Sequence, residues 1–202
     1  NGIVAEKDYG KILDSLVLEI PEGKGSLDKV ELIILDILAH YNWDRPIYMA
    51  QRGGDLQIGL KDYLQYDGFV YKFVPIKSAT GRENGNLDQV DEDEMYNRVM
   101  NVYKWDNFKD TTLNIDYQHL LTFNSLVSPR DIMVQTAKAL YTRGKEEKAV
   151  EVLDRMQELI PAATLPLNNS IISGLNDKAV LDAISVYCAA GEKKKAYKLA
   201  DE

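Results

Sequence analysis

The last third of the chain carries a spacing of small and apolar residues that restricts its fold more than any other feature. Gly144, Ala149, Leu153, Met156 and Pro161 lie at offsets of 0, 5, 9, 12 and 17 residues. Such offsets place apolar side chains on one face of a helix, while glycine allows the turn before it and proline ends it. We therefore expect this region to form a helical hairpin.

The first helix of that hairpin is predicted over residues 128–143, because Ser128 suits a cap and Pro129 suits the first helical position. Residues 146–160 supply the second helix. The spacing matches the second half of a tetratricopeptide repeat, in which small residues let two helices approach closely. The segment 162–174 that follows is longer than a standard repeat linker, so we describe the hairpin as tetratricopeptide-like.

A partial echo of this pattern predicts a second hairpin. Gly191, Ala196 and Ala200 again lie at offsets of 0, 5 and 9 residues, and residues 176–190 would form the helix before them. The chain ends before this second repeat is complete.

The first part of the chain mixes strand and helix patterns. Three runs rich in β-branched and aromatic residues predict strands, over Leu16–Ile20, Pro46–Ala50 and Phe69–Ile76. Residues 27–41 predict a helix capped by Ser26, apolar over most of its surface and hence buried on most sides. The fold class expected is α+β: a small mixed β-sheet with packed helices, followed by an α-helical tetratricopeptide-like tail.

Between these elements we expect a short helix at 60–66 that ends at Gly68, and an exposed loop at 77–90. A further helix is predicted over 91–103, with Met95, Val99 and Val102 as its buried stripe. Irregular structure is expected for 105–127. The predicted domains are therefore an α+β domain at residues 1–127 and helical hairpins at 128–202.

The net charge of −8 comes entirely from the first predicted domain. Residues 1–127 hold 21 acidic and 13 basic side chains, and residues 128–202 hold 11 of each. This acidity argues against nucleic acid or an anionic membrane as the main partner. No apolar run reaches the roughly 20 residues that span a bilayer. The sequence starts without methionine or a signal peptide, so a fragment that lies outside the membrane is expected.

Neither a catalytic centre nor a metal site is evident. Cys188 is the only cysteine, and His40 and His119 have no metal-ligand spacing, so zinc is not expected. An acidic run begins like a calcium loop, but Gln89 stands where that loop needs glycine and Met95 where it needs glutamate. We predict no catalytic residue, no metal and no cofactor.

One cluster could form a binding site. Trp43, Arg45 and Tyr48 lie together between the predicted helix and the second strand. Aromatic rings offer apolar faces and arginine offers a planar fork of donors, as a sugar or peptide site requires. The alternative, which we favour, is a structural corner in which Trp43 enters the core and Arg45 pairs with a carboxylate. Replacing a buried, paired Arg45 by alanine would cost about 3–5 kcal/mol.

The same cluster carries a family resemblance. The run Asn42-Trp43-Asp44-Arg45-Pro46-Ile47-Tyr48-Met49-Ala50 resembles a motif near the C-terminus of large bacterial multispanning proteins. So does the pattern that runs from Gly59-Leu60 through Tyr63-Leu64, Gly68 and Tyr71 to Pro75-Ile76. These proteins are similar to protein O-mannosyltransferases and form a family of unknown function. The similarity covers about Leu16 to the end.

The resemblance implies a parent protein whose membrane region transfers a sugar from a lipid-linked donor, and a soluble part on the periplasmic, extracytoplasmic side of a bacterial membrane. The acidic catalytic residue of such proteins lies in the membrane region, so none is carried over here. We therefore expect an accessory domain that positions a protein or glycan acceptor, or a partner subunit. The alternatives are a free-standing soluble enzyme, such as a hydrolase, and a purely structural scaffold.

Overall fold

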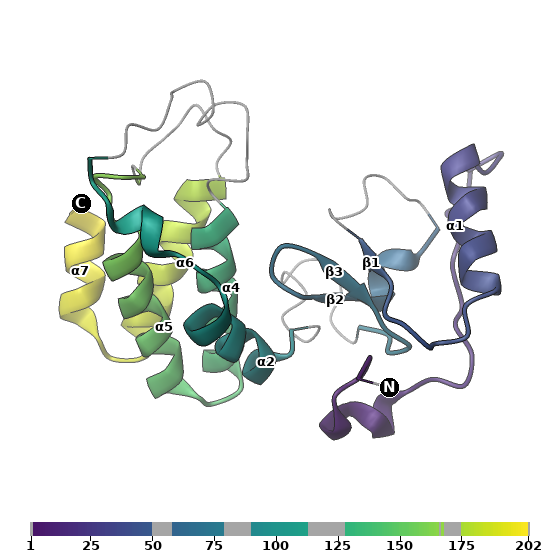
Figure 1. Ribbon diagram of the computed structural model, residues 1–202, viewed down its shortest axis with the longest axis horizontal. Coiled ribbons are helices and arrows are strands. Elements are labelled where there is room, and N and C mark those ends of the chain that lie inside the picture. The colour runs from purple at the N-terminus through teal and green to yellow at the C-terminus, as the bar shows by residue number, and fades with distance from the viewer. Residues whose placement is uncertain are drawn as a thin grey trace. The chain divides into compact units, whose positions relative to one another are not determined.

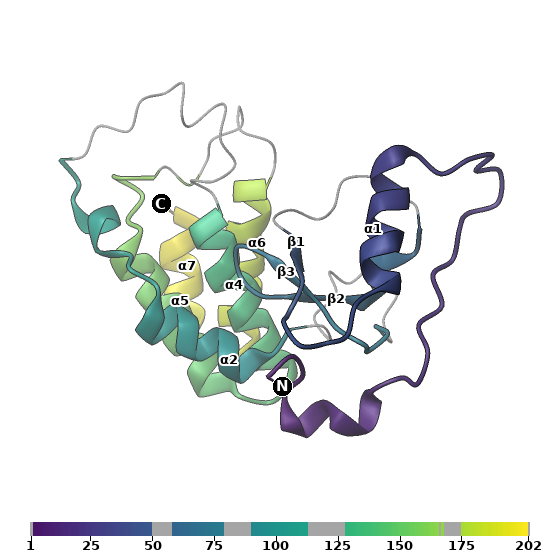
Figure 2. The same ribbon diagram turned by 45° about the vertical axis from the view of Figure 1, so that its right-hand side comes forward.

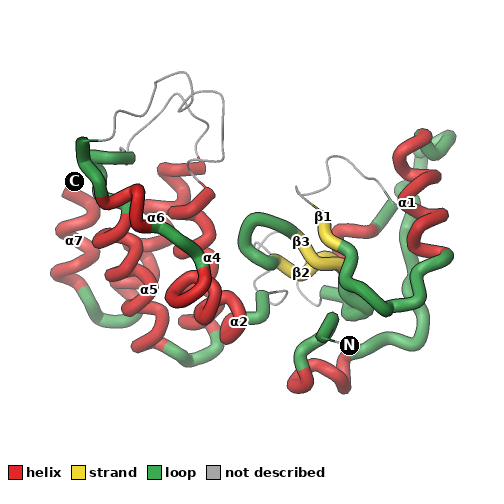
Figure 3. The backbone as a smooth tube through the Cα atoms, in the orientation of Figure 1, coloured by secondary structure: helices red, strands yellow, loops and turns green. Residues whose placement is uncertain are grey.

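The computed structural model describes residues 2–49, 58–78, 90–112, 128–165, 167 and 175–201. The chain divides into two compact units, Asn1–Asp91 and Glu92–Glu202. The first contains a small sheet with helices and the second is helical, as Figures 1 and 3 show. The predicted α+β class is thus confirmed.

The sheet of the first unit has three short strands. They are β1 (Tyr48–Met49), β2 (Leu64–Tyr66) and β3 (Tyr71–Phe73), in the order β1-β3-β2. Both pairings are antiparallel, so the sheet is not mixed as predicted. A hairpin joins β2 to β3, and its tight turn is closed by the Asp67 amide, which donates to the Val70 carbonyl at 2.9 Å.

Two of the predicted elements in this unit differ from the structure. Leu16–Ile20 forms no strand and has no ladder with another described segment. The helix predicted over 60–66 lasts only as the 3₁₀ helix Leu60–Tyr63 before the chain becomes strand β2. The reason is that Gly68 turns the hairpin in a left-handed conformation (φ 78°) instead of ending a helix.

The core of this unit is built around the sheet and the short 3₁₀ helix. Five side chains are almost completely buried and contact one another: Ile58, Leu60, Tyr63, Leu64 and Phe73. Partly buried apolar side chains from the N-terminal segment, helix α1 and strand β1 pack around them. The aromatic edge of the core is therefore continuous with the segment 41–49 that the sequence picks out as a candidate site.

Helix α1 (Lys29–Ala39) is rotated relative to the prediction. Its fully buried residue is Glu31, whereas Val30, Ile33 and Ile37 are each at least half exposed. Glu31 is buried because it takes part in three interactions: its amide donates to the Asp28 carboxylate, its carboxylate accepts from the Asp28 amide, and that carboxylate pairs with Lys24. The cap is thus Asp28, not Ser26, and the helix is not buried on most sides.

The second unit begins with α2 (Glu92–Asn97), which continues as a π-helical turn over Arg98–Val102. The wider turn changes the phase of the helix, so Met95 and Val99 are buried while Val102 is 53% exposed. The Trp105 indole closes this turn by donating to the Val99 carbonyl at 2.9 Å. The predicted stripe therefore holds for two of its three residues.

Four longer helices follow. They are α4 (Ser128–Thr142), α5 (Glu146–Leu159), α6 (Leu175–Ala189) and α7 (Lys193–Asp201), after the short 3₁₀ helix Asp106–Lys109. Helix α4 packs on α5 and α6, and α6 packs on α7. Gly144 and Gly191 both turn the chain in left-handed conformations, so the two predicted hairpins are present.

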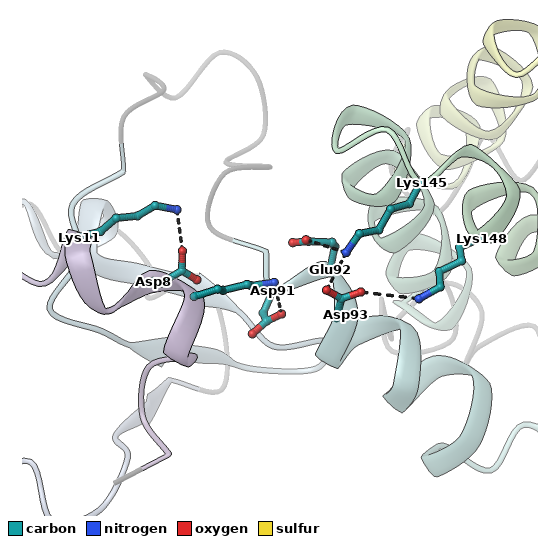
Figure 4. Close-up of polar contacts among 8 residues, drawn as sticks. Asp8, Lys11, Asp91, Glu92, Asp93, Lys145 and Lys148 are labelled. Carbon is teal, nitrogen blue, oxygen red and sulfur yellow. Dashed lines mark hydrogen bonds and ion pairs between the residues drawn. The ribbon is translucent and has the colours of Figure 1, made fainter.

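The division between the units lies at residue 91, earlier than the predicted boundary at 127. Helix α2 belongs with the hairpins because it packs on α4 and because Lys145 bridges to Glu92 at 3.1 Å and Asp93 at 2.6 Å. Figure 4 shows both bridges converging on the Lys145 ammonium group. Most of the loop predicted at 77–90, most of 105–127 and part of 162–174 lie outside the described residues.

Candidate functional site

The first unit contains a pocket of about 700 Å³ that lies against the predicted site. Its walls come from the N-terminal segment, helix α1 and the loops beside the sheet. Its apolar lining residues are Ile3, Val4, Tyr9, Ile12, Leu13, Leu16, Leu38, Trp43 and Pro75. Asp14 and Ser15 are the polar side chains among its lining residues, so the pocket suits an apolar group with a polar or cationic edge.

The N-terminal segment, residues 2–16, forms one wall of the pocket, and we call it the strap. It contains the 3₁₀ helix Glu6–Lys11, which has no buried residue. Contacts to the rest of the unit include a hydrogen bond from the Leu13 amide to the Pro75 carbonyl at 2.9 Å and the ion pair of Lys7 with Asp91 at 3.0 Å. A further ion pair within the strap joins Lys11 to Asp8 at 2.6 Å, as Figure 4 shows. Ile3 of this wall is buried, whereas Tyr9, Ile12 and Leu13 are exposed and accessible.

Trp43 also lines the pocket, and its backbone conformation is strained. Its φ of 62° makes it the one non-glycine residue with a positive φ in the described chain. The indole stacks on Phe73 with ring centres 5.6 Å apart and lies 4.4 Å from the Tyr41 ring. Tyr41 donates to the Arg45 carbonyl at 2.6 Å, and burial raises the pKa of its hydroxyl. These contacts fix the corner that presents Trp43 to the pocket.

The structure separates the three predicted site residues. Trp43 lines the pocket, but Arg45 and Tyr48 do not. Both are exposed, and no carboxylate of the described residues lies within 4.0 Å of the Arg45 guanidinium. The favoured prediction of a buried ion pair at Arg45 is therefore wrong. The neighbouring carboxylate, Asp44, accepts a hydrogen bond from the Asn42 side chain.

The strap residues of the pocket were not identified from the sequence. Tyr9, Ile12, Leu13 and Leu16 are nevertheless spaced at i, i+3, i+4 and i+7, which is the pattern of one helix face. That spacing is the signal that could have found them. The segment between the 3₁₀ helix and Leu16 is not helical, so the pattern marks a shared apolar surface and not a longer helix.

No group of three or more His, Cys, Asp or Glu side chains in the described parts of the chain could hold a metal ion. His40 lies at the end of α1, 2.8 Å from the Asp36 carbonyl, and Cys188 is an exposed thiol on α6. His119 falls outside the described residues.

The strongest perturbations in the helical unit occur in interactions between helices. Tyr187 donates to Asp154 at 3.0 Å and accepts from Gln157 at 2.7 Å, and its burial together with the Asp154 charge raises its pKa. Lys195 pairs with the same aspartate at 2.8 Å. The hydrogen bond from Tyr96 to Glu151 raises the pKa of Tyr96 to about 12. These groups link α2, α5, α6 and α7, so we interpret their role as structural.

The comparisons with known proteins concern the unit that holds the pocket. Residues 1–94 match the family model described as TMEM260-associated domain 2, a domain from a membrane protein family. The match thus covers the first unit and ends three residues beyond Asp91. No curated protein and no solved structure matches the chain. In the described part, no helix is long and apolar enough to cross a membrane. The first unit is therefore similar to a domain associated with a membrane protein family.

Proposed function

We propose that the chain is an accessory interaction domain of a membrane-embedded, glycosyltransferase-like protein, in which it holds an acceptor or a partner polypeptide on the extracytoplasmic side. The match of residues 1–94 to a domain associated with a membrane protein family supports the link to a membrane protein. The sequence resemblance around Trp43 supports glycosyl transfer as the activity of the parent. The sugar-transferring groups would belong to the parent, outside these residues.

The apolar pocket is the observation that carries the proposal. Asp14 and Ser15 supply polar side chains to the wall, and most of the other lining residues are aliphatic or aromatic. A pocket of this kind contributes binding through the burial of apolar surface, at about 25 cal/mol per Å². It therefore suits the capture of an apolar side chain of a polypeptide.

Trp43 has the central part in this proposal. It is held by Phe73 and Tyr41 while it lines the pocket, so its ring is fixed before a ligand arrives. A rigid aromatic wall loses little side-chain entropy on binding. Arg45 and Tyr48 are exposed close to it in sequence, and we assign them to outer polar contacts with the same partner.

The experiment compares sugar transfer by membranes that contain the complete parent protein with and without a functional pocket. The test variant is Tyr9→Ala with Leu13→Ser, because both side chains line the pocket and are at least 40% exposed. The matched control is Leu181→Ser with Tyr197→Ala, two exposed apolar side chains of the helical unit. We expect roughly tenfold less labelled sugar on acceptor protein for the test variant alone, which corresponds to about 1.4 kcal/mol of binding.

Equal transfer by both variants and the wild type, at equal amounts of parent in the membrane, would contradict the role of the pocket. Transfer that survives deletion of the whole domain would favour a purely structural scaffold. Turnover by the isolated chain itself would favour the soluble-enzyme alternative. The three outcomes are distinguishable because each is read from a different sample.

A further inference from the structure

The backbone of Leu16–Ile20 has two sides with different surroundings. The Tyr63 hydroxyl accepts from the Val17 amide at 3.1 Å and donates to the Val17 carbonyl at 3.0 Å. Two residues later, Glu19 presents its amide and carbonyl to Gly59: a β-carbon built on that glycine would lie 2.6 Å from the Glu19 nitrogen and 3.2 Å from its oxygen. The polar groups of both residues therefore face the core of the unit.

Alternate residues of an extended chain direct their amides and carbonyls to opposite edges. Leu16, Leu18 and Ile20 must then direct theirs away from Tyr63 and Gly59. Within the described chain these three residues form no hydrogen bond through the backbone. Figure 2 shows this stretch at the margin of the first unit, between the N-terminal 3₁₀ helix and α1. With respect to the described residues, the segment therefore offers an open backbone edge like that of an extended strand.

Side-chain burial agrees with an extended segment. Leu16 and Leu18 pack on the core, whereas Val17 is 61% exposed and Glu19 is exposed as well. Leu16 and Leu18 thus rest on the unit, whereas Val17, Glu19 and Ile20 are exposed to solvent. This arrangement explains why the sequence predicts a strand here although the structure contains no partner strand for it in the described residues.

We propose that the outer edge of Leu16–Ile20 accepts an added β-strand from a partner polypeptide. Backbone donors and acceptors in a row are matched by an extended chain, because only such a chain offers complementary groups at the same spacing. The proposal rests on the interaction role proposed above but not on the pocket. It specifies how a partner would bind: by main-chain pairing along three residues.

The charge around the edge specifies the partner further. Asp14, Glu19 and Glu22 are all exposed, and residues 12–23 contain no lysine or arginine. Lys77 offsets part of this charge through its 3.4 Å contact with Glu19. Opposite charges across a strand pair stabilise it and like charges destabilise it. The added strand is therefore one in which apolar residues alternate with basic residues.

The test uses the full 202-residue chain and a short acetylated peptide in which lysine and valine alternate. Binding is measured by amide chemical shifts and by hydrogen exchange of Leu16, Leu18 and Ile20. We expect protection of these three amides but not of Val17, whose amide is already bonded. A scrambled peptide of the same charge controls for attraction to an acidic protein.

Two matched pairs isolate the backbone contribution. N-methylation of either the valines or the lysines of the peptide removes donors from one edge only, so one of the two peptides should lose binding. In the protein, Ile20→Pro removes the outward amide while Ile20→Ala keeps it, and Ile20 is 51% exposed. We expect Ile20→Pro to bind about fivefold more weakly than Ile20→Ala, the effect of one net hydrogen bond.

Equal binding of both N-methylated peptides would overturn the proposal. Shift changes confined to Val30, Ile33 and Ile37 on α1 would overturn it as well, because the surface that binds would then be one that suits an apolar helix. Dimerisation of the chain through the same edge in place of peptide binding would overturn it too. The pocket variant Tyr9→Ala with Leu13→Ser should bind the peptide normally. Failure of the edge and failure of the pocket are thus read separately.

Discussion

Replacing Tyr63 by phenylalanine removes one hydroxyl group that makes two hydrogen bonds to Val17. The ring itself is 1% exposed and would keep its packing, including its contact with Phe73 at 6.4 Å between ring centres. The loss is therefore confined to the hydroxyl. Each such bond contributes about 1 kcal/mol net, so the variant should unfold about 2 kcal/mol more easily.

The measurement must isolate the first unit, since two units in one chain do not guarantee a single unfolding transition. Trp43 is the sole tryptophan of residues 1–91. Fluorine NMR of the chain labelled with fluorotryptophan therefore follows this unit through its own resonance during urea unfolding. Hydrogen exchange gives a second, local readout: the Val17 amide should exchange much faster in the variant.

The control is Tyr48→Phe, because Tyr48 is 46% exposed and its hydroxyl makes no hydrogen bond with a described residue. We expect a change of no more than about 0.5 kcal/mol there. The reasoning is refuted if Tyr63→Phe also stays within that limit, or if Val17 exchange is unchanged. Either result would mean that the Val17 backbone is not anchored by this hydroxyl.

Three further predictions follow from described contacts. Gly59→Ala should destabilise the first unit by at least about 2 kcal/mol, because its φ is +71° and the new β-carbon would meet the Glu19 backbone at 2.6 Å. Its control is Gly23→Ala, where φ is +89° and the space around the glycine is open. That variant should cost about 1 kcal/mol in the same urea experiment. Arg45→Ala should change the free energy of unfolding by less than about 0.5 kcal/mol, since the side chain is exposed. A loss of several kcal/mol would instead support the hypothesis of a buried ion pair. The raised pKa of Tyr96, about 12 against an ordinary 10.0, stabilises the fold fully below pH 10 and loses its effect as pH rises through 12. Tyr96→Phe should flatten that part of the stability profile, and the phenolate absorbance difference between the two proteins should titrate near 12, not near 10.

The helical hairpins could be predicted closely because their signals are local. Gly144 and Gly191 need left-handed conformations, and the residues after them place their apolar side chains at helical spacing. Such turns depend on a few adjacent residues. The π-helical turn at Arg98–Val102 could not be predicted in the same way, since it depends on the Trp105 indole reaching back to the Val99 carbonyl.

The first unit was harder to predict because its elements depend on distant contacts. Glu31 is buried through Lys24 and the capping box, which turns Val30, Ile33 and Ile37 towards solvent against the expectation from hydrophobicity alone. Strand β1 contains two residues and exists through its pairing with β3. Of the candidate site, Trp43 was predicted from the sequence, whereas the strap residues were not, although the spacing of Tyr9, Ile12, Leu13 and Leu16 carries a signal for them.

The way the hairpins pack has a consequence for how the second unit comes apart. Helix α4 packs on α2, α5 and α6, whereas α7 packs mainly on α6. In an array where each member touches its neighbours, cooperativity runs along one dimension. On heating or in denaturant, the helices should therefore unfold in order from α7 towards α4, and the Lys195–Asp154 ion pair should break first. The resistance of this unit to unfolding would then be graded along the chain and greatest around α4.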